Sequence, residues 1–290
     1  MISELNLDLQ AFAKRVYNSL LYQSTFYNFL NPAYIGTLRQ TGAPVIEIAK
    51  TTPLSVNVRE TREIQSALDP ALTTYGRTLV DLTELPMDYA IRVPVCITGS
   101  DITNAIQDAA DLEDSAIAKQ IDTYGYKKLK GSVTNAKQWA PADQAGYITA
   151  LNGLRATLFN KDVYGDYRLG LKATEYANLV SALTSVLKFE TLQGREGVDM
   201  GMIARVYGIA VFEINDNVIN PVVADHTETV LGYFYNPIAV VGDTFFSAFV
   251  QTASDIRYPG YYCLSGNQLF GAEVVKQDAI IKLQSEVVSG

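Results

Sequence analysis

The chain has 290 residues, 48% of them hydrophobic and 19% charged, with a formal net charge of −8. This composition is that of a globular protein whose core suits one large domain or two smaller ones, and it excludes an intrinsically disordered chain. The sequence has no run of about 18 apolar residues, the length that a membrane-spanning helix needs. Its first residues are acidic and polar where a signal peptide is basic and then apolar, so we expect a cytoplasmic product.

The cysteines and the basic residues argue against two further kinds of site. Cys96 and Cys263 lie far apart among strand-forming residues, which indicates reduced, packed thiols and not a disulfide framework or a zinc knuckle. The densest basic cluster is Lys127, Lys128 and Lys130. A protein that binds phosphates through its own basic face is therefore not predicted, and only loose contact with nucleic acid stays open.

Residues 5–30 have apolar side chains at helical spacing and predict an amphipathic N-terminal helix. Its apolar stripe consists of Leu5, Leu9, Phe12, Val16, Leu20 and Leu21. An aromatic patch follows at Phe26, Tyr27 and Phe29, and Asn31-Pro32 ends the helix. No hairpin partner for this helix is evident in the sequence, so it packs either on another layer of the same chain or on another subunit.

Between residues 42 and 94 the apolar residues recur with a period of two, which predicts strands. These strands are expected at 45–48, 54–58, 79–82 and 89–93. Residues 60–75 are polar and charged without a core pattern, so the segment as a whole predicts a long hairpin with a polar tip. A hairpin of this size is marginally stable alone, and it needs another surface to lie on. A mobile loop is the alternative.

Residues 100–130 predict one long helix with strand-forming sequence on both sides. Its apolar residues recur at three- and four-residue spacing, which places them on one face. They are Ile102, Ala105, Ile106, Ala109, Leu112, Ala116, Ile117, Ile121 and Tyr124. The helix is expected to end at Gly131 and to span about 40 Å, the diameter of a domain. A helix broken at Gly125 is the alternative.

After a polar connection at residues 131–146, helical and strand-like segments alternate, which indicates helices packed on a sheet. Helices are predicted at 147–158 and at 174–187, and Thr174 caps the second one. Strands are predicted at 167–171, 202–207 and 209–214. Of the segments 237–241 and 245–250, one is expected to be a strand and the other a strand or a helix. The closing strands are expected at 261–264, 269–275 and 280–283, separated by turn residues.

The sequence contains no recognised catalytic or cofactor motif. Its one histidine, His226, stands beside Asp225, but no Gly-x-Ser-x-Gly elbow and no His-x-x-x-His pair accompanies it. Phosphate-loop, dinucleotide-binding and Cys-x-x-Cys patterns are absent as well. We therefore predict no catalytic residue, no cofactor and no metal site. A site assembled from scattered carboxylates, as in glycosidases, stays open as an alternative.

The predicted parts follow the order of an N-terminal helix, a long hairpin, a long helix, an α/β region and closing strands. This order resembles that of the HK97-fold major capsid proteins of tailed bacteriophages over nearly the whole chain. Local sequences are also similar to those of phage coat proteins. They are TEYANL at 174–179, GIAVF at 208–212, NPIA at 236–239, and NQLFGA at 267–272 before DAII at 278–281.

The resemblance implies an α+β chain with the HK97-like capsid fold in four parts. Residues 1–41 correspond to the N-terminal helical arm and residues 42–94 to the extended β-hairpin, called the E-loop. Residues 95–140 and 253–290 correspond to the P-domain, with a spine helix and a sheet, and residues 141–252 to the α/β A-domain. The implied function is structural and not enzymatic: hexamers and pentamers of one chain form an icosahedral shell around phage DNA.

The resemblance also implies partners and a location. The partner is the chain itself, with portal, scaffold or decoration proteins as further candidates, and packaged DNA is contacted weakly without sequence specificity. No membrane is involved, and the protein is expected in the virion after assembly in the host cytoplasm. Because the first helix follows Met1 almost at once, a separate scaffold or none is expected. Two alternatives stay open: an encapsulin-like cargo compartment, and an α/β hydrolase-type enzyme with an unrecognised site.

Charged residues of the hairpin and the long helix are the candidate subunit contacts. They are Arg59, Glu60, Arg62, Glu63 and Arg77 on the hairpin, and Asp108, Asp111 and Asp114 on the helix. Pairs between the arginines of one subunit and the aspartates of the next would contribute only about 0.2–1 kcal/mol each. A shell repeats every such contact many times. Solvated charge on a helix face is the alternative for the three aspartates.

Overall fold

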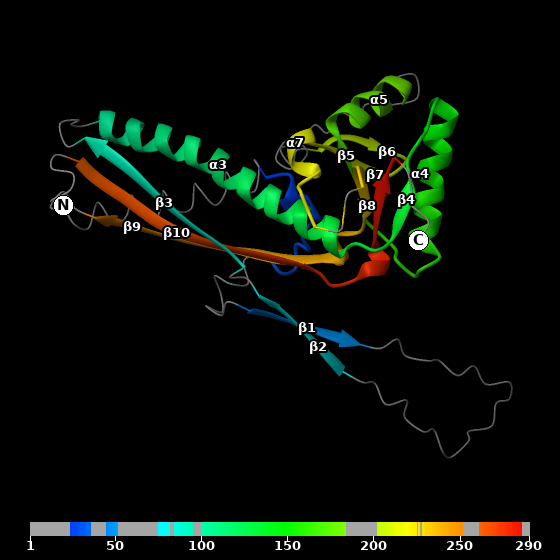
Figure 1. Cartoon of the computed structure of the whole chain (residues 1–290), viewed down its shortest axis with the longest axis horizontal. Coiled ribbons are helices and arrows are strands. Elements are labelled where there is room, and N and C mark those ends of the chain that lie inside the picture. Colours follow the sequence, from blue (N-terminus) through cyan, green and yellow to red (C-terminus); the bar gives the residue numbers. More distant parts are fainter. Residues whose placement is uncertain are drawn as a thin grey trace, which may run out of the picture.

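Three sheets and one long helix organise the described part of the chain (Figure 1). The computed structural model describes residues 24–35, 45–51, 75–81, 84–94, 100–183, 202–224, 226, 228–251 and 261–285. The sheets have two, three and six strands, in the orders β1-β2, β3-β10-β9 and β4-β11-β8-β5-β7-β6. Helix and sheet are therefore mixed in one chain, as the sequence predicts.

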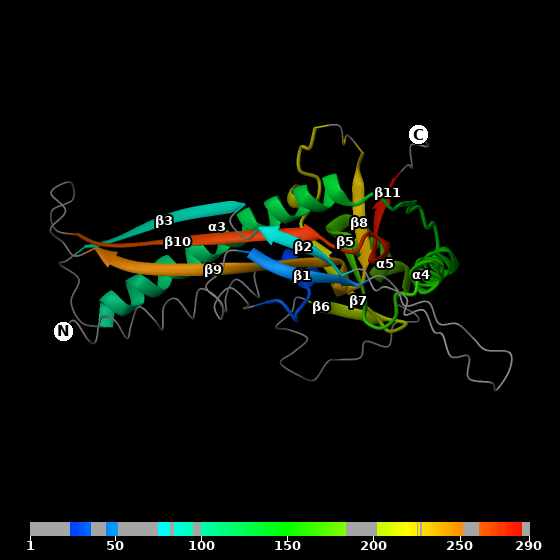
Figure 2. The same ribbon diagram turned by 90° about the horizontal axis from the view of Figure 1, so that it is seen from below.

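The long helix α3 (Ser100–Ser132) lies along the three-stranded sheet (Figures 1 and 2). Its 33 residues span about 50 Å. The sheet is antiparallel and consists of β3 (Leu85–Pro94), β10 (Tyr261–Val274) and β9 (Val240–Gln251). The prediction of one unbroken helix packed against strands from the end of the chain is confirmed. The helix continues through Gly131, its expected end, to Ser132.

Strand β10 is continuous where the sequence predicts two strands separated at Ser265-Gly266. Gly266 pairs with Tyr89 on one side and with Ala248 on the other. Because β10 is the central strand, both edges of its backbone are hydrogen-bonded, and these ladders outweigh the turn preference of Ser-Gly. In the same way, the two predicted segments at 237–250 become the 3-10 helix η2 (Pro237–Ala239) and the single strand β9.

The six-stranded sheet is mixed. Its strands are β4 (Ala136–Gln138), β11 (Ile280–Gln284), β8 (Val230–Tyr235), β5 (Tyr167–Lys172), β7 (Ile209–Ile214) and β6 (Met202–Val206). The β4–β11 and β5–β7 pairs are parallel and the other pairs are antiparallel. Strands β4 and β8 are absent from the sequence prediction. β4 is three residues within a polar connection, and β8 is almost uninterrupted in apolar residues, so neither has a period of two.

Among the described residues, three helices accompany the six-stranded sheet, namely α4 (Gln144–Phe159), α5 (Ala173–Leu183) and the short α7 (Asp216–Ile219). Helices α4 and α5 pack on each other, and α5 contacts β5 and β7, whereas α7 contacts α3 and β8. Asp143 caps α4 by accepting a hydrogen bond from Gly146 N at 2.8 Å. Thr174, the predicted cap of α5, lies inside its first turn, because the helix follows β5 directly.

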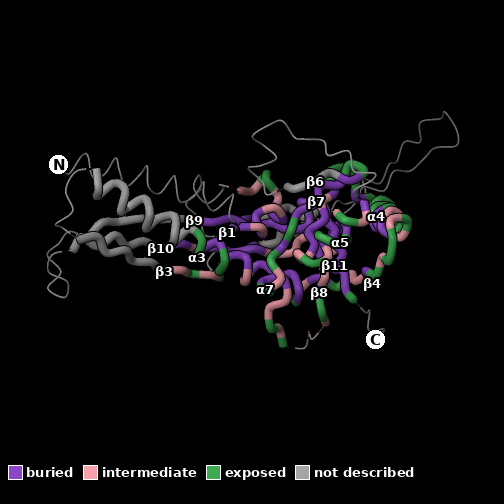
Figure 3. Tube along the Cα trace, turned by 90° about the horizontal axis from the view of Figure 1, so that it is seen from above, coloured by how far each residue is buried: buried purple, intermediate pink, exposed green. Residues whose placement is uncertain are grey.

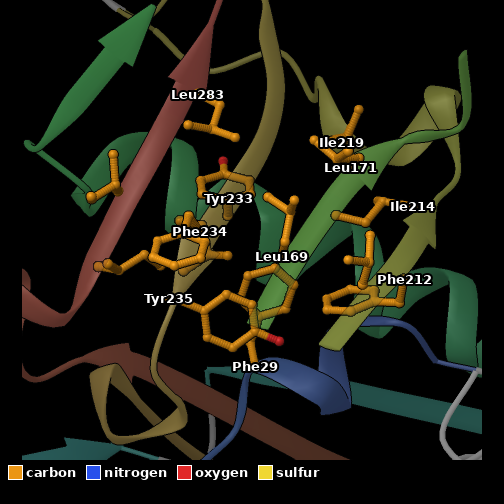
Figure 4. Close-up of a cluster of buried hydrophobic side chains, with 14 of the residues drawn as sticks. Phe29, Leu169, Leu171, Phe212, Ile214, Ile219, Tyr233, Phe234, Tyr235 and Leu283 are labelled. Atoms are coloured by element: carbon orange, nitrogen blue, oxygen red, sulfur yellow. The ribbon is translucent and has the colours of Figure 1, made fainter. Parts of the chain in front are cut away.

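The main core lies between the six-stranded sheet, the end of α3 and the segment at residues 24–30 (Figure 3). Phe29 is fully buried and stacks on Tyr235 with ring centroids 4.1 Å apart (Figure 4). Its ring also meets Tyr126, Phe212 and Tyr233 edge to face at 5.6–5.7 Å. The aromatic patch predicted near the N-terminus is therefore part of the core, where such ring pairs are favourable.

The segment around this patch differs from the predicted α-helix over residues 5–30. Residues 5–23 lie outside the described residues. Phe26–Phe29 form the 3-10 helix η1, and Leu30 makes an isolated bridge with Val240. A short 3-10 turn lets Phe26 and Phe29 both enter the core, stacked on each other at 5.7 Å, since its side chains at i and i+3 are aligned.

The helix α3 turns a different face to the core from the predicted stripe. Ile117 and Ile121 are buried as expected, but Ala116 is exposed, and Tyr126 and Leu129 are fully buried. Residues 24–30 cover this part of the helix, and they add Asp122 and Gly125 to its buried face. The burial of the first half of the stripe, up to Asp114, lies outside the described side chains.

Candidate subunit-contact surface

The hairpin predicted as the main subunit contact forms a two-stranded sheet of its own. Strands β1 (Val45–Thr51) and β2 (Tyr75–Asp81) pair antiparallel from Val45↔Asp81 to Thr51↔Tyr75. The cross-strand pair Ile46 and Val80 is buried against Val241 at the start of β9, and these three residues form a small separate cluster. The described part of the hairpin therefore contacts the rest of the fold, which we call the body, through this small apolar cluster. An isolated two-stranded ribbon has little stability.

The hairpin predicted over residues 42–94 is shorter in the structure. β3, which the sequence analysis includes in it, pairs with β10 along its whole length, from Pro94↔Tyr261 to Leu85↔Phe270. The apolar alternation of β3 has the same period in either sheet, so the period alone does not choose the partner strand. The two-stranded part thus stops at Asp81, and a short joint leads into the three-stranded sheet.

Glu84 ties this joint to α3, and Lys128 of α3 extends the contact to Glu273 of β10. Lys128 Nζ lies 2.9 Å from Glu84 Oε2 and 3.0 Å from Glu273 Oε2, and the hydroxyl of Tyr124 donates to the Glu84 carboxylate. Partial burial acts to lower the pKa of Lys128, but the two carboxylates outweigh it and raise that pKa. Burial and the bond to Glu84 also raise the pKa of the Tyr124 hydroxyl. These contacts hold the place where the hairpin leaves the body.

A second anchor, at Asp122, holds the segment at residues 24–30 on α3. Its carboxylate accepts hydrogen bonds from Ser24 Oγ at 2.5 Å, Thr25 Oγ1 at 2.9 Å and Phe26 N at 3.0 Å. Burial raises the pKa of Asp122 despite these bonds. At Gly125, one turn further on, an added Cβ would lie 2.4 Å from the Phe26 ring. Only glycine lets this ring approach the helix so closely.

A third anchor joins β11 to the end of α3. Lys282 is 4% exposed, and its Nζ lies 2.5 Å from Glu228 Oε1 and 3.3 Å from the carbonyl oxygen of Lys130. Burial acts to raise the pKa of Glu228, but the hydrogen bond and charge of Lys282 outweigh it and lower that pKa. His226 Nδ1 lies 3.4 Å from the same carboxylate oxygen. The one histidine of the chain thus stands beside a structural ion pair.

The structure describes only some of the predicted contact residues. Arg59, Glu60, Arg62 and Glu63 lie outside the described residues. Arg77 lies in β2 opposite Ala49. Asp108, Asp111 and Asp114 lie in α3, in a part whose side chains the structure does not describe. The expected pairing joins two subunits, so it stays a prediction.

The anchoring residues were not singled out from the sequence. Glu84, Asp122, Glu228 and Lys282 each meet partners at least 40 positions away, with the separations reaching 152 residues for Lys282 and Lys130. No local signal marks Asp122 either, because it stands beside the predicted apolar stripe of the helix and not within it.

Neither a metal site nor a membrane span is found in the described part of the chain. Its His, Cys, Asp and Glu side chains form no group of three or more that suits a metal ion. None of its helices combines the length and the apolar character needed to cross a bilayer. Of the two cysteines, Cys263 lies in β10 opposite Arg92 and Gln251, and Cys96 lies outside the described residues.

Comparison with solved structures shows which fold these elements form. A chain from Mycobacterium phage Che8 matches with a TM-score of 0.59 at 18% identity, over 90% of this chain and 91% of that one. The capsid of Ralstonia phage GP4 matches with a TM-score of 0.61 at 8% identity, over 85% and 84%. The capsid of cyanophage P-SCSP1u gives 0.56 at 13% identity, over 85% and 84%. The chain has the HK97-like fold of phage capsid proteins.

The HK97-like fold was predicted from the order of the elements, and this prediction is confirmed. No protein-family model and no curated sequence matches the chain. At 8–18% identity, the similarity lies in the arrangement of the helices and strands and not in the sequence. Within the HK97-like fold, α3 is the spine helix, and the hairpin β1–β2 stands where the resemblance expects the E-loop.

Proposed function

We propose that this chain is a phage major capsid protein, which assembles as hexamers and pentamers into an icosahedral shell around double-stranded DNA. The observation that carries the proposal is the HK97-like fold, which the chain shares with phage capsid structures over 85–90% of its length. The role is structural and not enzymatic, the location is the virion, and assembly takes place in the host cytoplasm. Portal, scaffold and decoration proteins are the further partners expected of such a shell.

The construction of the hairpin supports a function that joins subunits. Its described strands rest on one small cluster, Ile46, Val80 and Val241, while the body has an extensive core of its own. A segment with so little internal support gains stability from another surface. In a shell, that surface belongs to a neighbouring subunit.

The domain division is part of the proposal, and it differs from the sequence analysis where the strand pairing differs. The N-terminal arm is residues 1–41 and the E-loop begins at residue 42, but the E-loop ends before Glu84, because β3 pairs with β10. The P-domain then consists of α3 and the three-stranded sheet, and it gains β9. The A-domain is built on the six-stranded sheet, which β11 joins from the end of the chain.

The charged contacts also stay part of the proposal. Arg59, Arg62 and Arg77 of one subunit pair with Asp108, Asp111 and Asp114 of the next, each pair adding about 0.2–1 kcal/mol. Exposed pairs are screened by salt. Replacing Arg59 and Arg62 by Glu is therefore expected to prevent assembly or to make it strongly dependent on salt, and unchanged assembly would contradict the pairing.

The deciding experiment is to express the full chain and to examine it by size-exclusion chromatography and negative-stain electron microscopy. Closed particles of uniform size are expected, and a chain that stays monomeric with scaffold and portal proteins present would overturn the proposal. Particles isolated from infected cells should contain DNA. A cargo enzyme in place of DNA would favour the encapsulin-like alternative.

A deletion of residues 63–74 tests the hairpin within the proposed function. The monomer should remain folded, as judged by circular dichroism, because the deletion removes none of the described core. Closed shells should not form. Normal particles from this variant would show that the deleted residues are an ordinary loop.

A further inference from the structure

Residues 24–35, which we call the strap, contact α3 and all three sheets. The strap contains the 3-10 helix η1 and an isolated bridge from Leu30 to Val240, and none of its residues belongs to a strand of a sheet. Its contacts change along its length, from α3 at the start to the hairpin at the end. The strap therefore connects parts of the molecule that are far apart in the sequence.

The start of the strap is fixed to α3 by one buried carboxylate. Asp122 is 6% exposed and accepts four hydrogen bonds, from the hydroxyls of Ser24 and Thr25 and from the backbone N of Thr25 and Phe26. Hydrogen bonds to a charged group are stronger than those between neutral groups. Without this carboxylate, two backbone N–H groups would lose their acceptor, and the start of the strap would be held less firmly.

The middle of the strap joins the two larger sheets through a row of aromatic rings. The ring of Phe26 lies 6.1 Å from that of Phe270 in β10 and 5.7 Å from that of Phe29. Phe29 in turn lies 4.1 Å from Tyr235 in β8 (Figure 4). The carbonyl oxygen of Asn28 also accepts the Tyr235 hydroxyl at 2.7 Å. Because a packed interior deforms little, a shift of the strap moves rings that pack on both sheets.

The end of the strap reaches the hairpin. Asn31 N donates to the carbonyl oxygen of Val240, at the start of β9, at 2.9 Å. Three residues later, Tyr34 packs on the small apolar cluster that holds the hairpin on the body. Its neighbour Ile35 packs on the main core. The strap thus contacts both hydrophobic clusters at adjacent positions.

The strap also supports the residue of β9 on which the hairpin rests. Leu30 makes a bridge with Val240, which precedes Val241, and its Cδ2 lies 3.0 Å from the position of a Cβ added at Gly242. Of the three described residues that pack on the buried hairpin pair, Tyr34 belongs to the strap and Val241 lies beside it. A two-stranded ribbon has little stability of its own, so its attachment depends on these contacts.

Two consecutive turns make the strap stiff. In η1, Leu30 N donates to the carbonyl oxygen of Tyr27 at 3.2 Å. In the next turn, Tyr34 N donates to the carbonyl oxygen of Asn31 at 3.1 Å, and Pro32 has its φ fixed by its ring. A displacement at the start of the strap is therefore transmitted to Tyr34, because no long flexible stretch lies between them to absorb it.

From these contacts we propose that the strap couples the anchor at Asp122 to the attachment of the hairpin, so that loosening one end loosens the other. The two states are the strap packed against α3 and the strap released from it. Coupling of this kind runs through contiguous packed side chains and is reciprocal. It is a property of the single chain, so it does not require the proposed function. In a shell, it would make the attachment of each hairpin depend on the position of the N-terminal segment.

The first test is Ser24→Ala in the full chain, measured at a concentration too low for assembly. The variant lacks one of the four hydrogen bonds to Asp122. Amide hydrogen exchange should become about tenfold faster in the strap, because a hydrogen bond to a charged group is lost. Exchange in β1 and β2 should become faster as well, while α5 keeps its rate. Faster exchange in the strap with an unchanged hairpin would overturn the inference.

Two further variants complete this test. Asp122→Ala removes all four hydrogen bonds and should enlarge both effects. Lys161→Ala is the matched control, because it breaks polar contacts with Asp278 at 2.9 Å and with Asn135 at 3.1 Å, away from the strap. The control should leave exchange in the hairpin unchanged, and equal acceleration by Lys161→Ala would overturn the inference. A wild-type chain that never assembles would overturn the proposed function and leave these measurements unaffected.

The second test runs in the opposite direction. Ile46→Ala loosens the hairpin, so exchange at the backbone N–H of Phe26, which is bonded to Asp122, should become faster. Because coupling is reciprocal, the coupling factor should be the same as in the first test. Val45→Ala, at a position that is 39% exposed, is the control and should leave the strap unchanged. An unchanged strap in Ile46→Ala would overturn the inference.

The third test breaks the contact through which the strap meets the hairpin. Tyr34→Ala alone should speed exchange in β1 and β2. Adding Ser24→Ala should then speed it no further, because the two changes act on one connected path. Tyr164→Ala deletes the same kind of ring at a position that is 57% exposed, and it is the matched control. In that background Ser24→Ala should keep its full effect on the hairpin. Simple multiplication of the effects of Ser24→Ala and Tyr34→Ala would overturn the inference.

Discussion

The six-stranded sheet and the hairpin β1–β2 are both made of short strands rich in apolar residues, but they are stabilised very differently. The larger sheet shares its core with α3 and η1, and its central rings, among them Phe29 and Tyr235, are fully buried. The hairpin has one buried cross-strand pair, Ile46 and Val80, against Val241. Both regions thus have strand-forming sequences. They differ in stability because more layers pack on the strands of the larger sheet.

The two regions also use charge differently. In the body, Lys282 and Glu228 form an ion pair that is mostly buried, with side-chain exposures of 5% and 16%. At the hairpin joint, Lys128 and Glu84 remain 28% and 35% exposed. Water screens the second pair far more than the first. The buried pair is therefore expected to contribute more to stability than the pair at the joint.

The largest effect should come from the centre of the body. Phe29→Ala removes a ring that packs on five others, and it should lower the free energy of unfolding by about 3–5 kcal/mol. Phe159→Ala makes the same chemical change at a ring that is 56% exposed and should change the monomer by about 0.5 kcal/mol or less. Urea unfolding of both monomers measures the difference. Similar losses would show that the body does not depend on this aromatic core.

The buried ion pair should give the next largest effect. Glu228→Gln leaves the ammonium group of Lys282 without its carboxylate and should cost about 3 kcal/mol, near the lower end for breaking a buried pair because Glu228 is partly exposed. The double variant with Lys282→Met should recover part of this loss. Urea unfolding of the three proteins gives the comparison, and a double variant less stable than Glu228→Gln would contradict the explanation.

The same pair predicts a dependence on pH. The pKa of Glu228 is lowered in the folded protein, so its contribution is fully present above the unfolded pKa of about 4.3 and is lost as the pH falls through the lower folded pKa. The difference in unfolding free energy between wild type and Glu228→Gln should therefore shrink below about pH 4. A difference that stays constant from pH 7 to pH 3 would contradict the pairing.

A substitution in the small cluster that holds the hairpin on the body should have a local effect. Ile46→Ala removes half of the buried cross-strand pair. The packing of the hairpin on Val241 is then weaker by about 2 kcal/mol, which should speed hydrogen exchange in β1 and β2 about 30-fold. Global unfolding should hardly change. Val45→Ala, next to it but 39% exposed, is the control. An equal loss of stability throughout the body would show that the hairpin and the sheet unfold as one unit.

The smallest effect should come from the joint. Glu84→Gln weakens a partly exposed pair with Lys128 and should lower stability by about 1 kcal/mol or less. The loss should decrease as salt is added, because salt screens the pair in the wild type. Asp88→Asn, at an exposed position of β3, is the control for a changed charge. A loss independent of salt would assign the effect of Glu84 to packing.

The sequence by itself determined the elements whose patterns are local and long. The apolar period of residues 100–130 predicted α3 as a single helix, and the alternation around Ile46 and Val80 predicted β1 and β2. Their order resembles that of the HK97-fold capsid proteins, and this resemblance implied the fold that the structure shows. Candidate contacts could be named from charge alone, although Arg59 and Arg62 lie outside the described residues.

Only the tertiary structure decided which strands pair and which side chains hold the parts together. β3 has the same alternation whether it extends the hairpin or joins β10, and Ser265-Gly266 reads as a turn until ladders on both sides make β10 continuous. Asp122 looks like a solvated helix residue until Ser24 and Phe26 cover it. Partners that lie a hundred residues apart leave no periodic signal in the sequence, because only the folded chain brings them within hydrogen-bonding distance.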